Sequence, residues 1–214
     1  MFYRFIVVLG TIFVRPFFSL KVLHKNRIEK GPGIIVCNHL RMFDVVLITF
    51  VFRKENVVYV AKAEAFKNSF VRWFFNRMGA ISIDRENADP KAMIRIVRAL
   101  KQGKKVCIFP EGTRNKENLE LLPIKNGASV MAAMAKVPVY PLIQYNRFKL
   151  FHRTTIIVGE KYELSEYYGK KMTSEEMDAA GEDMRNRLLA LQQEVRELMA
   201  LPKKERKKRL QESK

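Results

Sequence analysis

The chain has 214 residues, which suits one domain of ordinary size and is too short for two. Hydrophobic residues make up 48% of it, which excludes a globally disordered chain and predicts a packed core. Lys and Arg outnumber Asp and Glu by 40 to 22, and the resulting net charge of +18 favours an anionic partner: nucleic acid, anionic lipid or a phosphorylated substrate.

Residues 1–24 contain two apolar runs separated by Arg15-Pro16. A helix that crosses a bilayer needs about 20 consecutive apolar residues, and Arg4, Arg15 and Lys21 interrupt this segment. We therefore expect 1–24 to be a membrane-interface segment whose amphipathic helix lies with its apolar side in the lipid. The alternative is a core helix of a soluble domain.

Residues 201–214 form a basic tail. Cations beside a membrane are attracted to an anionic leaflet, although a solvated tail is the alternative. The two cysteines, Cys37 and Cys107, lie in apolar segments and are expected to be buried, reduced thiols. No cysteine or histidine cluster predicts a metal site. These features favour a peripheral or monotopic protein on the cytoplasmic face of the cell membrane.

Between the two ends, residues 25–200 alternate short apolar runs with helical patterns, without an internal repeat or linker. The predicted strands are 33–37, 57–61, 80–83, 105–109, 137–144 and 154–158. The predicted helices are 42–52, 69–78, one from the Asp89 cap to Gly103, one from about 125 to 135, and 175–201. The alternation predicts a single α/β domain with a mostly parallel or mixed sheet flanked by helices.

In such folds the working residues follow the carboxyl ends of strands. Asn38 and His39 follow the first predicted strand, and Asp44 comes five residues after His39. Histidine is the usual general base near neutral pH, and a carboxylate on its other nitrogen orients it. On a regular helix the two side chains would point about 140° apart, so they meet only if His39 lies at a turn before the helix. The alternative is a capping histidine with an unrelated carboxylate.

Two further strand ends carry groups of the kind that can bind phosphate. Asp84-Arg85 places a guanidinium at the sheet edge, although an ordinary surface ion pair is the alternative reading. Pro110 ends another strand and is followed by a turn that offers a hydroxyl and a cation. The residues of this turn are Glu111, Gly112, Thr113 and Arg114. Lys125 precedes a helix whose N-terminal amides also favour anions.

Four segments of the chain, in this order, resemble the motifs of the glycerolipid acyltransferase family, in particular its bacterial 1-acylglycerol-3-phosphate acyltransferases. The matching segments are Asn38-His39-x4-Asp44, Gly79 to Arg85, Phe109 to Arg114, and Val137 to Pro141. Asn115 stands where the family usually has serine. The resemblance covers about residues 25–160.

The resemblance implies direct acyl transfer from acyl-CoA or acyl carrier protein to the free hydroxyl of lysophosphatidic acid, with no cofactor and no metal. It implies that His39, oriented by Asp44, is the general base and that Glu111 braces the loop. The implied substrate-binding residues are Arg85, Glu111, Gly112, Thr113, Arg114 and Lys125.

The expected partners are membrane lipids and the acyl donor, and no nucleic acid is expected. The sequence alone leaves four alternatives open. The acceptor could be glycerol-3-phosphate, another lysophospholipid or a lipid-linked molecule without phosphate. The chain could instead be a nucleic-acid-binding module or an inactive lipid-binding relative. A Cys37–His39 acyl-enzyme is the least favoured of these readings.

Overall fold

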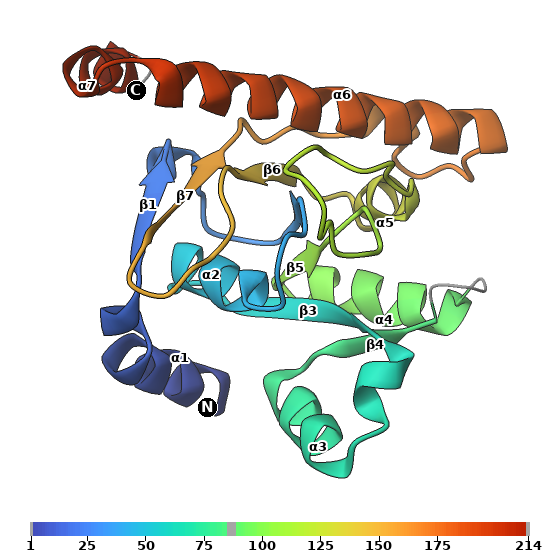
Figure 1. Ribbon diagram of the computed structural model, residues 1–214. Helices are drawn as coiled ribbons and strands as arrows, with labels where there is room; N and C mark the ends of the chain where they lie inside the picture. Colours follow the sequence, from blue (N-terminus) through green and yellow to red (C-terminus); the bar gives the residue numbers. More distant parts are fainter. Residues whose placement is uncertain (1, 85–88, 213–214) are drawn as a thin grey trace.

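The structure is a computed structural model that describes residues 2–84 and 89–212, in which a twisted sheet lies between layers of helices (Figure 1). The strands are β1 (Ser19–Leu23), β2 (Gly33–Cys37), β3 (Val57–Lys62), β4 (Ile81–Ile83), β5 (Lys105–Ile108), β6 (Val139–Gln144) and β7 (Arg153–Val158). The helices are α1 (Phe2–Phe13), α2 (Asp44–Val51), α3 (Ser69–Met78), α4 (Pro90–Lys101), α5 (Gly127–Ala135), α6 (Ser174–Ala200) and α7 (Lys203–Glu212).

The described strands form one seven-stranded sheet in the order β1-β7-β6-β2-β5-β3-β4. Neighbouring strands are parallel except β6 and β7, which pair antiparallel and are joined by the loop 145–152. The single-domain α/β prediction with a mixed sheet is therefore confirmed. Because β2, β5, β3 and β4 are parallel neighbours, their carboxyl ends meet at one edge of the sheet, where ligands bind in open α/β folds.

Helices cover both faces of the sheet, as the continuous apolar run of β2 requires. Every residue of β2 is buried, and successive side chains enter opposite cores. Ile34 and Val36 belong to the core under α4, α5 and α6, whereas Ile35 and Cys37 belong to the core under α1 and α2. The central strands are thereby held rigidly, which positions the loops that follow them.

The predicted strand 33–37 and helix 69–78 are confirmed to the residue, and the other predicted elements lie within about two residues of their observed ends. Asp89 caps α4 by accepting a hydrogen bond from the Ala92 amide, as its sequence predicts. The predicted helix 42–52 begins only at Asp44, because the residues before it form a turn around the Asp44 carboxylate.

The structure corrects the interpretation of residues 1–24 as one segment. Only Phe2–Phe13 is α-helical, and Ser19–Leu23 is strand β1, paired with β7 at the edge of the sheet. Leu20 and Val22 pack on the core under α1 and α2, and Leu23 packs on the opposite core. The folded domain therefore includes β1, because a five-residue strand with side chains on both faces looks like a continued apolar patch when read without its partner.

The basic tail also has structure, since residues 203–212 form helix α7 after α6 (Figure 1).

At the other end of the chain, α1 packs against α3 through Phe2, whose ring lies edge-on to Trp73 at 5.9 Å between centroids. Across residues 2–84 and 89–212, none of the helices combines the length and apolarity needed to cross a membrane. The contact of α1 with lipid remains a prediction.

Candidate active site

The turn after β2 is built around Asn38, whose side chain clasps the end of β6. Its Nδ2 donates to the carbonyl of Gln144 at 3.0 Å, and its Oδ1 accepts from the amide of Gln144 at 2.7 Å. Asn38 is 1% exposed, so both bonds are shielded from water. The clasp holds the start of the turn, and with it His39, against the sheet.

Asp44 is fully buried and is the hub of this turn. Its Oδ2 accepts hydrogen bonds from the amides of Leu40 and Arg41, both at 2.7 Å. The same oxygen lies 2.9 Å from Nδ1 of His39. Because an ionised carboxylate can only accept, this contact favours the tautomer with its proton on Nδ1, which leaves Nε2 as the basic nitrogen of the ring. The turn between strand and helix thus brings together two residues that a regular helix would separate.

The His39 ring is held by a stacking contact as well as by its contact with Asp44. It stacks on Phe109 with 4.0 Å between centroids and 17° between planes. The His39 side chain is 13% exposed, so most of the ring is shielded while part of it reaches the groove described below. A ring fixed in this way keeps its basic nitrogen in one orientation.

Glu111 joins the His39 turn to the loop after β5. Its carboxylate accepts from the His39 amide at 2.6 Å and from the Leu122 amide at 3.1 Å. Burial raises the pKa of the Glu111 carboxyl, and these two hydrogen bonds oppose that rise. In return, the His39 carbonyl accepts from the amide of Asn115 at 2.7 Å. The two loops therefore form one hydrogen-bonded unit.

His39 opens onto a groove with a volume of about 640 Å³. One part of its lining is cationic or polar and another is apolar. The polar lining is His39, Lys62, Glu111, Gly112, Thr113, Arg114 and Lys125, and the apolar lining is Met42, Val45, Val60, Ala61, Ala65, Phe75 and Phe109. The groove therefore suits a molecule that carries both a negative charge and an apolar chain.

The structure gathers five of the six predicted substrate-binding residues at this edge of the sheet. Gly112 has φ of +67°, a conformation that glycine adopts without strain, and a Cβ there would lie 3.5 Å from Cε of Lys125. The Lys125 amide donates to the Pro110 carbonyl at 2.9 Å, which draws the lysine over the loop. The sixth predicted residue, Arg85, lies outside the described residues.

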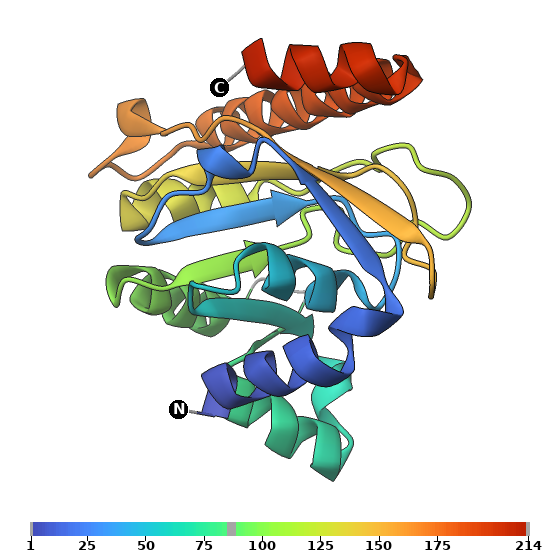
Figure 2. The same cartoon turned by 90° about the vertical axis from the view of Figure 1, so that its left-hand side faces the viewer.

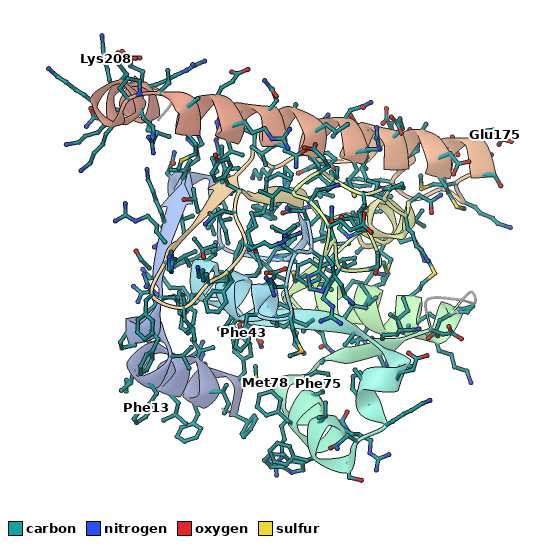
Figure 3. The ribbon with its side chains drawn as sticks, in the orientation of Figure 1. Phe13, Phe43, Phe75, Met78, Glu175 and Lys208 are labelled. Atoms are coloured by element: carbon teal, nitrogen blue, oxygen red, sulfur yellow. The ribbon has the colours of Figure 1, made fainter. Side chains whose placement is uncertain are left out.

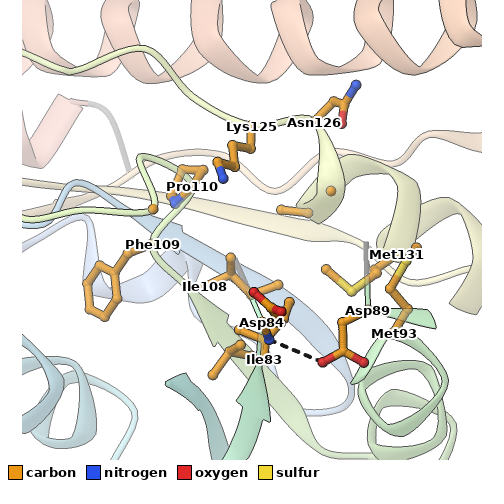
Figure 4. Close-up of a pocket in the computed structure, with 14 residues that line it drawn as sticks. Ile83, Asp84, Asp89, Met93, Ile108, Phe109, Pro110, Lys125, Asn126 and Met131 are labelled. Atoms are coloured by element: carbon orange, nitrogen blue, oxygen red, sulfur yellow. Dashed lines mark hydrogen bonds between the residues drawn. The ribbon is translucent and has the colours of Figure 1, made fainter. Parts of the chain in front are cut away.

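A second, smaller cavity of about 240 Å³ adjoins the groove and shares Val60, Phe109, Gly112 and Lys125 with it. Figure 4 shows its apolar side chains, from strands and from helices α4 and α5. These side chains are Ile83, Met93, Ile108 and Met131. At its rim the Asp84 amide donates to Asp89 Oδ2 at 3.1 Å.

A family model described as "Acyltransferase" matches residues 19–144, well over half of the chain. The chain belongs to the acyltransferase family. The match begins at the first residue of β1 and ends at the last residue of β6. It therefore contains the whole His39–Asp44 turn and the loop after β5 with Thr113 and Arg114.

Two bacterial relatives of this acyltransferase share the same name. This chain is 34% identical over 124 residues to the 1-acyl-sn-glycerol-3-phosphate acyltransferase of Bacillus subtilis, covering 58% of this chain and 61% of that protein. It is 30% identical over 162 residues to the enzyme of the same name from Helicobacter pylori, covering 68% of this chain and 67% of that protein. The matched part thus spans about two thirds of the length of these relatives.

The fold of this acyltransferase resembles the crystal structure of the 1-acyl-sn-glycerophosphate acyltransferase from Thermotoga maritima. The TM-score is 0.68 at 23% identity, over 94% of this chain and 80% of that chain. At this identity the likeness establishes the fold alone.

Three residues that build the site of this acyltransferase have no role that the sequence predicts. Gln144 receives the Asn38 clasp, Phe109 carries the His39 ring, and Asn115 folds the loop beyond Arg114. In the sequence, Asn115 is only a departure from the family motif. Its side chain is 3% exposed and binds its own loop, accepting from the amides of Glu117 and Asn118, both at 3.1 Å. None of these roles shows in a local pattern, because each partner comes from a loop conformation or a distant strand.

Proposed function

We propose that this protein is a 1-acylglycerol-3-phosphate O-acyltransferase, which moves a fatty acyl group from a thioester donor to the free hydroxyl of lysophosphatidic acid. The observation that carries the proposal is the buried Asp44 carboxylate 2.9 Å from Nδ1 of His39, at the mouth of a groove with a cationic wall. The names of the bacterial relatives support the choice of acceptor.

In the proposed reaction, Nε2 of His39 takes the proton from the acceptor hydroxyl as its oxygen attacks the thioester carbonyl carbon. Asp44 stabilises the resulting imidazolium, because its carboxylate already accepts the Nδ1 proton. The carbon–sulfur bond then breaks, and the departing thiolate takes the proton from the imidazolium. Donor and acceptor exchange one acyl group and one proton, and no acyl-enzyme forms.

The acceptor phosphate binds the cationic wall in this scheme. Thr113 supplies a hydroxyl, and Arg114 and Lys125 supply charge. Arg85 joins them by its place in the family motif. Holding the phosphate at one end of the groove sets the hydroxyl beside His39, and this positioning accounts for much of the expected rate enhancement.

The donor in this proposal is acyl-CoA or acyl carrier protein, and the apolar cavity beside the groove receives part of its acyl chain. Since both the acceptor and the product are membrane lipids, we also propose that the protein works at the cytoplasmic face of the membrane. Exposed apolar side chains of α1, namely Phe5, Val8, Ile12 and Phe13, support this placement.

The test incubates the purified protein with lysophosphatidic acid and a series of acyl-CoA donors, and measures free thiol release together with phosphatidic acid. Loss of general-base catalysis lowers rates by about 10²- to 10⁴-fold, so His39→Ala should reduce transfer by at least about 100-fold. Its thermal unfolding should remain cooperative, which shows that the loss is not a loss of fold.

Transfer by His39→Ala at more than a few per cent of the parent rate would remove the general-base role. If the parent protein makes no product, acyl carrier protein as donor is tried next, followed by glycerol-3-phosphate and other lysophospholipids as acceptors. No product with any of these pairs would contradict the proposed function.

A further inference from the structure

The outer edge of the sheet, where β1, β7 and α7 meet, carries a group of cations that the proposed reaction does not use. Lys21 lies half-buried in β1, and its charged neighbours are Arg153 at the start of β7 and two residues of α7, Lys203 and Arg206. Burial lowers the pKa of Lys21, and these three positive neighbours lower it further. Like charges held this close repel one another, so the arrangement favours an anion from outside the chain.

Helix α7 is held in place beside this edge. The Arg206 guanidinium donates to the Leu201 carbonyl at 2.9 Å and contacts Sδ of Met199 at 3.4 Å. Leu210 packs on the core and closes a hollow of about 370 Å³ whose other walls are residues 21–26. The other five Lys and Arg side chains of α7 are therefore exposed on a docked helix.

Apolar side chains lie at the lower end of the same edge, at the tip of the loop between β6 and β7. Phe151 is 77% exposed and Leu150 is 55% exposed. The Phe151 amide donates to the Phe17 carbonyl at 2.8 Å, and the two rings meet edge-on at 6.0 Å between centroids. Phe151 also has φ of +61°, a conformation that is strained for a bulky residue and that tends to occur at functional positions.

The apolar tip, the cations and α1 lie on one side of the molecule. Figure 2 looks directly at this side, with α1 below, β1 crossing the middle and α7 above. Figure 3 shows Phe13 and Lys208 on the same side, near its lower and upper ends. This surface thus has an apolar end and a cationic end.

We propose that this surface, the β1–α7 face, docks on an anionic lipid bilayer. The face consists of Phe17, Lys21, Leu150, Phe151, Arg153, Lys203 and Arg206. Its cations contact lipid phosphates, and its apolar tip enters the boundary of the acyl chains. The proposal rests on the proposed function only in that the substrates are membrane lipids.

An acidic protein is a poorer match for the same surface. Cations alone would suit an acidic protein, but Phe151 and Leu150 would then gain nothing from their exposure. A bilayer interface satisfies both ends at once, because anionic headgroups and apolar chains lie within a few ångströms of each other. The pairing of Phe17 with Phe151 also joins the tip to the segment that follows α1.

The charge part is tested with full-length protein and vesicles of phosphatidylcholine, with or without phosphatidylglycerol, in a sedimentation assay without substrate. The double variant Arg153→Gln, Lys203→Gln should bind anionic vesicles about 30-fold more weakly, which corresponds to about 1 kcal/mol for each cation. Its binding to neutral vesicles should change little. The matched control, Lys91→Gln with Lys101→Gln, removes two exposed cations from α4 and should bind like the parent.

The apolar part is tested with Phe151→Asn, since asparagine tolerates the positive φ and removes the ring. This variant should bind both neutral and anionic vesicles at least about 10-fold more weakly. Ile94→Asn, at an exposed apolar position of α4, is the control and should leave binding unchanged.

Binding of either test variant at its control's affinity would overturn the docking face. Normal vesicle affinity with slower transfer from acyl carrier protein would also overturn it and would assign the cations to an acidic carrier. Because vesicle binding is measured without donor or acceptor, the outcome does not depend on whether lysophosphatidic acid is the substrate.

Discussion

Arg114 is the cation near His39 whose substitution tests the proposed phosphate site most directly. It is exposed and lines the groove. A charge that holds the acceptor in both ground and transition states acts on binding. Arg114→Ala should therefore raise the KM for lysophosphatidic acid by about 10-fold or more, with a smaller effect on kcat.

The matched control for this experiment is Arg98→Ala, an exposed arginine of α4. Kinetics at varied acceptor and saturating donor separate the two parameters. An acceptor KM equal to that of the control would remove Arg114 from the phosphate site.

Asn115 illustrates how a departure from a motif can be structural. Besides accepting two amides, its Nδ2 donates to Asn118 Oδ1 and to the Glu120 carbonyl, both at 2.8 Å. Asn115→Ala should lower the free energy of unfolding by about 1–3 kcal/mol, because the loop loses all four hydrogen bonds to this buried side chain. Denaturant titration measures this loss.

The same variant should keep the acceptor preference of the parent, because the Asn115 side chain binds its own loop rather than the groove lining. A changed ratio of kcat/KM between lysophosphatidic acid and glycerol-3-phosphate, at unchanged stability, would instead make Asn115 a specificity residue.

Helix α1 has a buried side and an exposed apolar side, which its composition alone does not distinguish. Tyr3 and Val7 are buried in the core under α1 and α2, whereas Phe5 and Ile12 are more than half exposed. Deleting residues 1–23 would remove β1 along with α1 and would damage the sheet. Point substitutions on the exposed side are the sharper test of lipid contact.

The double variant Phe5→Gln, Ile12→Gln should bind vesicles at least about 10-fold more weakly, since both side chains lose their apolar contact with lipid. Its melting temperature should stay close to that of the parent. Val7→Ala is the control: it should cost about 2 kcal/mol of stability and leave vesicle binding intact. Unchanged binding of the double variant would show that α1 is a core helix alone.

At the scale of the whole molecule, the two cysteines report on the integrity of the layered core. Cys37 and Cys107 are fully buried on adjacent strands. Burial raises the pKa of both thiols, so at pH 9 a smaller fraction of them is ionised than of a free thiol, whose pKa is about 8.5.

Iodoacetamide at pH 9 should therefore label the native protein at least about 100-fold more slowly than the denatured protein, because only opened molecules react. Mass spectrometry measures the labelling, and transfer activity should persist meanwhile. Rapid labelling of Cys37 with parallel loss of activity would support the Cys37–His39 acyl-enzyme instead.

The amino-acid sequence determined the elements and the chemical groups of the site. Short apolar runs between capped helices predicted the α/β sheet, since burial on both faces leaves no polar positions in a central strand such as 33–37. The rule of strand ends then located His39, Glu111 and Arg114, because the carboxyl ends of parallel strands share one edge.

Only the tertiary structure decided how these groups meet. The Nδ1 contact of His39 requires a turn shaped by Asp44, by the Asn38 clasp on β6 and by the Phe109 ring. The place of β1 depended on β7, which lies more than 130 residues later in the chain. Such contacts join distant segments, so no local sequence pattern predicts them. The β1–α7 face also combines distant segments, so only the tertiary structure shows it.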